Sequence, residues 1–259
     1  MFCLAACHPA VDQRRDLVYS RPGGHALRLD LFTTRGHAGL EPAIVFFHQG
    51  GWYQGDKSLL RREAEHEALG GFAAACVQYR LSGEAPYPAA LDDAREAVRW
   101  LRGHAAGYGI DPARIAAAGS SSGGYLAAML ATEGAVRAAV AFYPVTDFVS
   151  FGQAAPHDPT NFLARFLGCS YAEASGLWAQ ASPFGHANAA TAPLLILHGT
   201  VDDLIPLRHS EEFVERLRQA GARPELIKVE GAGHGFLTEA RFHDDAVSHM
   251  EEFLARALK

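Results

Sequence analysis

The stretch that most constrains the fold lies at residues 115–132 and reads IAAAGSSSGGYLAAMLAT. It begins as a short apolar run and ends with helical periodicity, so a turn must lie between a strand and a helix. This turn contains G-x-S-x-G, whose small residues permit a sharp backbone bend around the serine. Of three adjacent serines, only Ser121 has glycine both two residues before and two residues after it. We therefore expect Ser121 to be a nucleophile held above the sheet, at the positive end of the following helix.

Short apolar runs alternate with helical periodicity along most of the chain. Apolar residues spaced three and four apart predict helices around 91–101 and 247–257. Asp111-Pro112 is a turn signal before one predicted strand. This alternation predicts the α/β class, with a mainly parallel sheet, helices on both faces and ligands bound at the carboxyl ends of the strands. The predicted strands are Leu27–Phe32, Ala43–His48, Ala74–Tyr79, Ile115–Gly119, Ala138–Tyr143, Leu194–His198 and Glu225–Val229.

The composition excludes several classes of protein. The chain has 259 residues, of which 49% are hydrophobic and 20% charged, so it is neither disordered nor of low complexity. A formal net charge of −6 disfavours nucleic acid as a partner. No apolar run approaches the length needed to span a bilayer, so we predict no integral membrane segment. We expect one α/β domain over residues 1–259 that acts on a small molecule; its oligomeric state stays open.

The cysteines and the start of the chain say little about the compartment. Four cysteines are too few for a disulfide framework, and Cys76 lies in an apolar run where it should pack as a small hydrophobe. The start, MFCLAACHPA, lacks the basic region of a signal peptide. Residues 4–7, LAAC, resemble the end of a bacterial lipoprotein signal, although coincidence is the simpler interpretation. The compartment is left open, with the cytoplasm slightly favoured over secretion or lipid anchoring.

A nucleophilic serine needs a base to accept its proton and a carboxylate to orient that base. In sheets with this turn, the acid and then the histidine follow the serine along the chain. Asp202 and Asp203 follow the predicted strand Leu194–His198, and either could be the acid. His234 lies in a glycine-flanked loop after Glu225–Val229 and is the predicted base. Asp147, after another strand, is more simply an N-cap or turn residue.

Other histidines are weaker candidates. His209, His243 and His249 lie in charged stretches of helical periodicity, which indicates surface positions. His243 and His249 are six residues apart and so do not share a helical face, and the chain has no HExxH motif. We therefore predict no metal site.

A glycine-containing loop, His48-Gln49-Gly50-Gly51-Trp52, directly follows a predicted strand. Glycines let the backbone turn its amides toward a substrate oxygen. An oxyanion hole would combine donors from this loop with the amide of Ser122, the residue after the nucleophile. His48 is expected to hold the loop through a hydrogen bond.

Residues 147–192 interrupt the alternation with scattered aromatic side chains and a short helical stripe at Phe162–Leu167. A long insertion between two strands, above their carboxyl ends, could form a cap over a cleft, and an additional packing helix is the alternative. Three aromatic side chains near these motifs are predicted to contact substrate: Trp52, Phe148 and Phe236.

Taken together, these motifs resemble the α/β-hydrolase superfamily, and in particular small carboxylesterases related to hormone-sensitive lipase and the acetyl-xylan-type esterases. The resemblance extends from Tyr19 to the end of the chain. It is carried, in order, by HQGGW, YRLSGEAPYPAALDD, YGIDPARIAAAGSSSGG, HGTVDDLIP and GAGHGF.

The resemblance implies a role for each of these positions. The pattern H-G-x-x-D-x-x-V-P makes Asp202 the acid, beside Ser121 as nucleophile and His234 as base. It also implies that Gly50, Gly51 and Ser122 supply the oxyanion-hole amides. Two departures from the family are Gln49, where many relatives have a glycine, and the serines at 120 and 122, where relatives commonly have aspartate and alanine.

The leading hypothesis is therefore a serine ester hydrolase that forms an acyl-enzyme, needs no cofactor and takes small esters. By analogy with the family, a modest cap implies short acyl chains such as acetyl. A second hypothesis is amide hydrolysis, because residues 198–221 resemble the catalytic domain of prolyl oligopeptidase and the HxGGxW-like loop resembles that of kynurenine formamidase. A third is a non-catalytic module that binds a small ligand.

Overall fold

The computed structural model describes residues 10–158 and 160–259 of the chain. The lipoprotein-like residues 4–7, together with Cys3, lie outside these ranges. Cys76 is buried and donates to the carbonyl oxygen of Leu60, so it packs as predicted. None of the helices in the described ranges is both long and apolar enough to cross a lipid bilayer.

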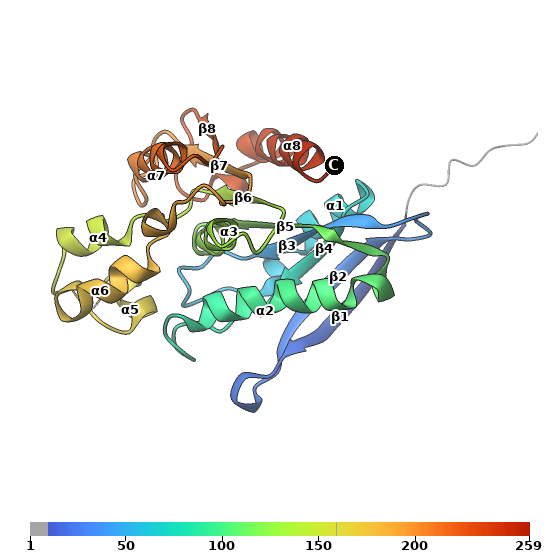
Figure 1. Ribbon diagram of the computed structural model, residues 1–259, viewed down its shortest axis with the longest axis horizontal. Helices are drawn as coiled ribbons and strands as arrows, with labels where there is room; N and C mark the ends of the chain where they lie inside the picture. Colours follow the sequence, from blue (N-terminus) through green and yellow to red (C-terminus); the bar gives the residue numbers. More distant parts are fainter. Residues whose placement is uncertain (1–9, 159) are drawn as a thin grey trace, which may run out of the picture.

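One eight-stranded sheet forms the centre of the molecule (Figure 1). Its strand order is β1-β2-β4-β3-β5-β6-β7-β8. The β1–β2 and β2–β4 pairs are antiparallel, and every other neighbouring pair is parallel. The α/β prediction is confirmed, and β3, β5, β6, β7 and β8 therefore end at the same edge of the sheet. The strands are β1 Val11–Ser20, β2 Leu27–Thr34, β3 Glu41–Phe47, β4 Ala73–Val77, β5 Ile110–Ser120, β6 Ala138–Phe142, β7 Leu194–Gly199 and β8 Glu225–Val229.

Helices cover both faces of the sheet, because alternate side chains of each central strand point to opposite sides. In β3, Val45 and Phe47 face a core shared with α2, α3 and α7, whereas Ile44 and Phe46 face a core shared with α1 and α8. The predicted helices around 91–101 and 247–257 are α2 and α8. The longer helices are α1 Arg61–Leu69, α2 Ala89–His104, α3 Ser122–Thr132, α7 Arg208–Gln219 and α8 Ala240–Ala257.

The described residues of the segment 147–192 contain three short helices, which lie together at one end of the molecule (Figure 1). The stripe Phe162–Leu167 is helix α5, and Asp147 caps α4 by accepting hydrogen bonds from the amides of Val149 and Ser150. The helices are α4 Phe148–Ala154, α5 Phe162–Leu167 and α6 Tyr171–Ala181, followed by the 3₁₀ turn η4 Pro183–His186.

The structure adds one strand, β1, that the sequence pattern did not reveal. Its residues, VDQRRDLVYS, carry four charges and little apolar alternation, because β1 is an edge strand whose middle is exposed. A bulge at Asp16 interrupts its register, and the amide of Asp16 donates to Oδ1 of Asp30 at 2.9 Å. The Asp111-Pro112 signal similarly produces a register shift inside β5 rather than an end to the strand.

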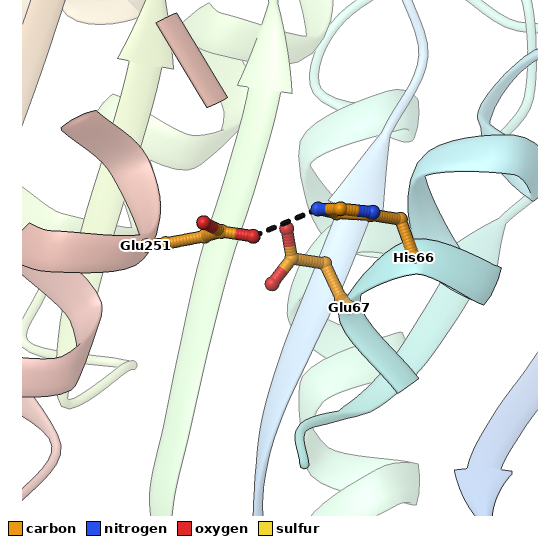
Figure 2. Close-up of side chains that lie close together, drawn as sticks. All are labelled: His66, Glu67 and Glu251. Atoms are coloured by element: carbon orange, nitrogen blue, oxygen red, sulfur yellow. Dashed lines mark hydrogen bonds and ion pairs between the residues drawn. The ribbon is translucent and has the colours of Figure 1, made fainter. Parts of the chain in front are cut away.

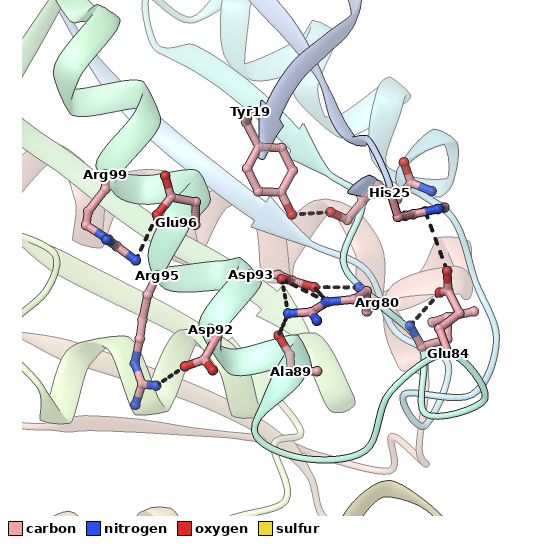
Figure 3. Close-up of polar contacts among 12 residues, drawn as sticks. Tyr19, His25, Arg80, Glu84, Ala89, Asp92, Asp93, Arg95, Glu96 and Arg99 are labelled. Carbon is pink, nitrogen blue, oxygen red and sulfur yellow. Dashed lines mark hydrogen bonds and ion pairs between the residues drawn. The ribbon is translucent and has the colours of Figure 1, made fainter. Parts of the chain in front are cut away.

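A partly buried ion pair fixes the segment between β4 and α2 (Figure 3). The guanidinium of Arg80 donates to both carboxylate oxygens of Asp93 at 2.7–3.1 Å and to the carbonyl oxygen of Ala89 at 3.3 Å. The backbone amide of Arg80 also donates to Asp93. Tyr19 of β1 donates to the carbonyl oxygen of Gln78, two residues before Arg80. These contacts tie β1, the end of β4 and the start of α2 together on one side of the sheet.

Candidate active site

Ser121 lies at the turn between β5 and α3, in a backbone conformation that non-glycine residues rarely adopt. Its φ is 53° and its ψ is −116°. A Cβ added at Gly119 would collide with the carbonyl oxygen of Gly123, and one added at Gly123 would collide with that of Phe47. The backbone can therefore make this tight bend because both flanking positions are glycine. The amide of Ser121 donates to the carbonyl oxygen of Phe142 at 2.9 Å, which fixes the turn against β6.

The structure brings Ser121, His234 and Asp202 together from three loops at the carboxyl edge of the sheet. Nε2 of His234 is 3.0 Å from Oγ of Ser121, and its Nδ1 is 2.8 Å from Oδ2 of Asp202. Serine and histidine are 113 residues apart in sequence. Asp203, the alternative acid, is exposed and outside this chain of hydrogen bonds.

Asp202 is buried and receives a hydrogen bond at each side of its carboxylate. Oδ1 accepts from the amides of Leu204 at 3.0 Å and Ile205 at 2.8 Å. Oδ2 accepts from His234 and lies 3.2 Å from Nε2 of His198. Burial alone would raise the pKa of Asp202, but hydrogen bonds from His198, His234 and Ile205 outweigh it and hold this pKa well below its ordinary value. Asp202 is therefore ionised at neutral pH.

His198 is a participant that the sequence analysis did not assign. It is fully buried at the end of β7, where Nδ1 lies 2.7 Å from Oγ of Ser210 and Nε2 lies 2.7 Å from the carbonyl oxygen of Ile205. These two partners fix the ring with Nε2–H directed at Ile205 and Asp202. The position of His198 at the start of the HGTVDDLIP motif was the signal in the sequence that could have indicated this role. A lone histidine inside an apolar strand is, however, more often a packing residue.

The loop His48–Trp52 lies beside Ser121. Gly50 and Gly51 both have positive φ, 135° and 58°, and within the described residues their amides donate no hydrogen bond to the protein. Ser122 is the first residue of α3, so its amide is one of the free amides at that helix end. Nδ1 of His48 lies 2.8 Å from the carbonyl oxygen of Gln49, and Tyr79 donates to the carbonyl oxygen of His48. His48 thus holds the loop as predicted, and burial lowers its pKa.

The side chain of Gln49 is directed toward Tyr143 and Ser120. Its Oε1 accepts from the hydroxyl of Tyr143 at 3.2 Å and lies 3.5 Å from Oγ of Ser120. Gln49 lines both the cleft that contains Ser121 and a separate apolar cavity of about 90 Å³ between the sheet and α8. The Gln49–Tyr143 hydrogen bond forms part of the wall between these two spaces.

The cleft above Ser121 has a volume of about 320 Å³. Of the described residues in the 147–192 segment, Phe162 lines this cleft. Trp52 also lines it, although its ring is buried and stacks on Phe166 with a centroid separation of 4.2 Å. The remaining lining comes from Gln49, Gly50, Gly51, Tyr53, Gln54, Val145, Leu204, Ile205, His234 and Gly235.

Two of the predicted substrate contacts lie elsewhere. Phe148 and Phe236 are fully buried, in the cores on opposite faces of the sheet, and neither lines the cleft. Phe236 packs edge-on against Tyr143, whose ring in turn packs edge-on against His234. Both phenylalanines therefore support the site by packing and are not available to touch a substrate.

The prediction that His209 is a surface residue is wrong. His209 is 2% exposed and stacks on Phe151 of α4. Its burial, followed by the charge of Arg208, lowers its pKa, so it packs as a neutral ring. Its carbonyl oxygen accepts from Oγ1 of Thr146 at 2.8 Å, which joins α7 to the segment before α4.

Backbone strain is concentrated at this site. Among the described residues, four non-glycine residues have positive φ, and three of them, Trp52, Ser121 and Tyr143, surround the cleft or its wall. Such conformations cost about 1–3 kcal/mol each and persist where the surrounding structure enforces them. Within the described residues, the cleft contains no group of three metal-ligating side chains, whereas one such group lies between α1 and α8.

The chain is similar to known esterases. Residues 29–217 match the family model described as BD-FAE. A probable carboxylic ester hydrolase of Mycobacterium tuberculosis, LipM, is 30% identical over an alignment of 240 residues that covers 84% of this chain and 54% of LipM. The chain spans about half the length of the curated relatives it matches.

Solved structures match over nearly the whole chain. Thermogutta terrifontis esterase 2 phosphonylated by sarin has a TM-score of 0.82 and 29% identity, and covers 98% of both chains. The propionate-bound form of the Thermogutta terrifontis esterase has a TM-score of 0.80 and 30% identity, over 96% of this chain and 94% of that one. The fold is therefore shared with esterases over nearly the whole chain.

Proposed function

Because this chain belongs to the BD-FAE family and has the α/β-hydrolase fold of esterases related to hormone-sensitive lipase, we propose that it is a serine carboxylesterase. One observation carries this proposal: His234 lies within hydrogen-bond distance of both Oγ of Ser121 and Oδ2 of Asp202. Serine, imidazole and carboxylate in this order form the arrangement that activates a hydroxyl for acyl transfer.

The proposed reaction has two acyl-transfer steps. Oγ of Ser121 attacks the carbonyl carbon of the ester while Nε2 of His234 accepts the hydroxyl proton. His234 then donates this proton to the departing alcohol, which leaves an acyl-enzyme. Water, deprotonated by His234, attacks the acyl carbon and releases the acid, and Ser121 regains its proton. Asp202 accepts a hydrogen bond from Nδ1 throughout and stabilises the imidazolium that forms in each step.

The oxyanion of each tetrahedral intermediate would be bound by backbone amides. Gly50 and Gly51 carry amides that the described residues leave free, and the amide of Ser122 lies at the N-terminus of α3. Donors of this kind act on charge that develops only in the transition state, and loss of one typically costs a factor of 10²–10³ in kcat.

We propose that the acyl group is short. Gln49 and Tyr143 close the wall between the cleft and the apolar cavity near α8, so a long acyl chain has no path into that cavity. The 147–192 segment acts as a small cap that lines the cleft through Phe162. The similar Thermogutta terrifontis esterase has a form with bound propionate, a three-carbon acid, which agrees with this size.

The nucleophile is tested with Ser121→Ala assayed on a chromogenic acetyl ester. We expect turnover to fall by at least three orders of magnitude, and Ser120→Ala, which removes the neighbouring hydroxyl, to stay within about five-fold of wild type. An organophosphonate should add its mass to the wild-type protein and not to Ser121→Ala. Turnover above about 1% of wild type in Ser121→Ala would contradict the proposal.

The acyl preference is tested with a series of esters from acetyl to octanoyl on one leaving group. Gln49→Ala removes the barrier between cleft and cavity and should raise the octanoyl-to-acetyl ratio of kcat/KM by about ten-fold or more. An unchanged ratio would show that Gln49 does not limit chain length. Matched arylformamide and peptide substrates in the same panel test amide hydrolysis, for which we expect rates far below those of the esters.

A further inference from the structure

Helices α1 and α8 bring three metal-ligating side chains together on the face of the sheet that they cover (Figure 2). His66 and Glu67 are adjacent on α1, and Glu251 comes from α8. Nε2 of His66 lies 2.9 Å from Oε1 of Glu251. One ligand atom from each of the three residues lies within 4.8 Å of the other two. His66 and Glu251 are 185 positions apart in sequence, so the packing of α1 against α8 creates this cluster.

Glu67 has no partner for either of its carboxylate oxygens among the described residues, although it is only 1% exposed. Figure 2 shows its carboxylate directed into the space between the helices, beside the contact of His66 with Glu251. A buried carboxylate without a hydrogen-bond donor is rare in proteins, because its desolvation is not compensated. No donor or cation among the described residues compensates the burial of this carboxylate.

We propose that His66, Glu67 and Glu251 bind a divalent transition-metal ion of the zinc class. One imidazole nitrogen and two carboxylate oxygens form a donor set that suits Zn²⁺, whereas Mg²⁺ and Ca²⁺ prefer oxygen ligands alone. Three protein ligands leave a fourth position for water. Tetrahedral donors about 2.1 Å from an ion lie roughly 3.4 Å apart, so the ion would replace the direct contact of His66 with Glu251 after a small separation of the two side chains.

The surroundings provide both access and a favourable charge. The side chains of His66 and Glu251 are 61% and 38% exposed, so an ion can reach them from solvent. They open into a hollow of about 240 Å³ whose lining contains four carboxylates and a single arginine, Arg62. Besides the three ligands, the charged or titratable groups that face it are Arg62, Glu63, His243 and Asp244. Excess negative charge in this hollow attracts a cation.

The site is separate from the cleft of Ser121 and does not depend on the proposed esterase activity. Glu67 supplies the buried ligand from α1, and Glu251 supplies one from α8, so the ion would join the two helices. Because the folded protein binds the ion and the unfolded chain has no assembled site, binding should stabilise the fold.

The experiment uses the full chain after treatment with EDTA and removal of the chelator, with Zn²⁺ as the probe. We expect calorimetry to show one equivalent of Zn²⁺ bound, and about 100 μM Zn²⁺ to raise the unfolding midpoint by roughly 3 °C or more. Co²⁺ bound at the same site should give visible absorption bands of tetrahedral intensity. Mg²⁺ and Ca²⁺ at the same concentration should leave the midpoint unchanged.

Variants separate this site from the other histidines of the chain. Glu67→Gln, His66→Ala and Glu251→Gln should each weaken Zn²⁺ binding at least ten-fold. The matched controls are Glu252→Gln and His249→Ala on α8, which lie outside the cluster and should bind within two-fold of wild type. Since His66 and Glu251 are exposed, their variants should fold even if Glu67→Gln does not. The proposal is overturned if Zn²⁺ does not bind at millimolar concentration, or if all five variants bind it equally.

Discussion

Asp202 and Glu67 are both buried carboxylates, yet they differ in the number of hydrogen-bond donors that surround them. Asp202 faces four hydrogen-bond donors, two of them backbone amides and two of them histidines. Glu67 has none among the described residues. The pKa of Asp202 is accordingly lowered, and that of Glu67 is raised to about 8. Burial alone therefore does not determine the charge of a carboxylate; the donors placed around it do.

The largest expected effect is on activity, and it comes from removing the charge of Asp202, the carboxylate with four hydrogen-bond donors. Asp202→Asn should lower kcat/KM for an acetyl ester by about 10³–10⁴-fold, because the amide cannot stabilise an imidazolium and favours the wrong tautomer of His234. Asp203→Asn is the matched control, since Asp203 is adjacent and exposed, and should change kcat/KM by less than two-fold. A larger loss in Asp203→Asn than in Asp202→Asn would reverse the assignment of the acid.

The pH dependence of stability should also report the donors around Asp202. Because its pKa is lower in the folded protein than in the unfolded chain, Asp202 stabilises the fold fully above about pH 4, and this contribution is lost as the pH falls further. Wild type should therefore lose on the order of 2 kcal/mol more stability than Asp202→Asn between pH 5 and the acid limit of folding. Urea titrations of both proteins at several pH values measure this difference. Parallel curves would contradict it.

A smaller effect is expected from removing one donor. His198→Leu leaves Oδ2 of Asp202 with His234 as its remaining side-chain donor, and should lower kcat about ten-fold, or about 1.4 kcal/mol, with little change in KM. His198→Asn retains an N–H donor and should recover part of this loss. If both variants lose kcat equally, or if only KM changes, His198 contributes through packing and not by positioning Asp202.

The smallest expected effect is on the free energy of unfolding, and it tests Glu67, the carboxylate without a hydrogen-bond donor. In EDTA at pH 8, Glu67→Met should raise the free energy of unfolding by about 1 kcal/mol, because it replaces an unsatisfied buried polar group with an apolar side chain of similar length. Thermal unfolding with and without Zn²⁺ measures both this gain and the loss of any response to the ion. Destabilisation in EDTA would mean that Glu67 has a partner that compensates its burial.

Sequence reasoning succeeded where the backbone itself encodes the structure. Strands β4 and β6 of the parallel part are continuous apolar runs, and the glycines around Ser121 mark a turn that few other residues permit. It was weakest where long-range packing decides the environment. β1 is polar because it is an edge strand. His209 is buried by Phe151 of α4, a helix that the periodicity of the sequence did not predict.

The same limit applies to the side chains around the candidate sites. Trp52, Phe148 and Phe236 are indistinguishable as aromatic residues near a motif, and only the fold separates the one at the cleft from the two in the cores. His66 and Glu251 belong to no local motif, since their contact depends on how α1 and α8 pack.

The crowding at Gly119 and Gly123 bears on how new specificities could be selected in this protein. Even alanine at either position would collide with a main-chain carbonyl oxygen, so substitutions at Gly119 and Gly123 should be left out of mutant libraries. Tyr53, Phe162 and Leu204 border the cleft from three separate segments and do not form the serine turn. Substitutions at these three positions can reshape what the cleft accepts while the backbone that presents the hydroxyl stays unchanged.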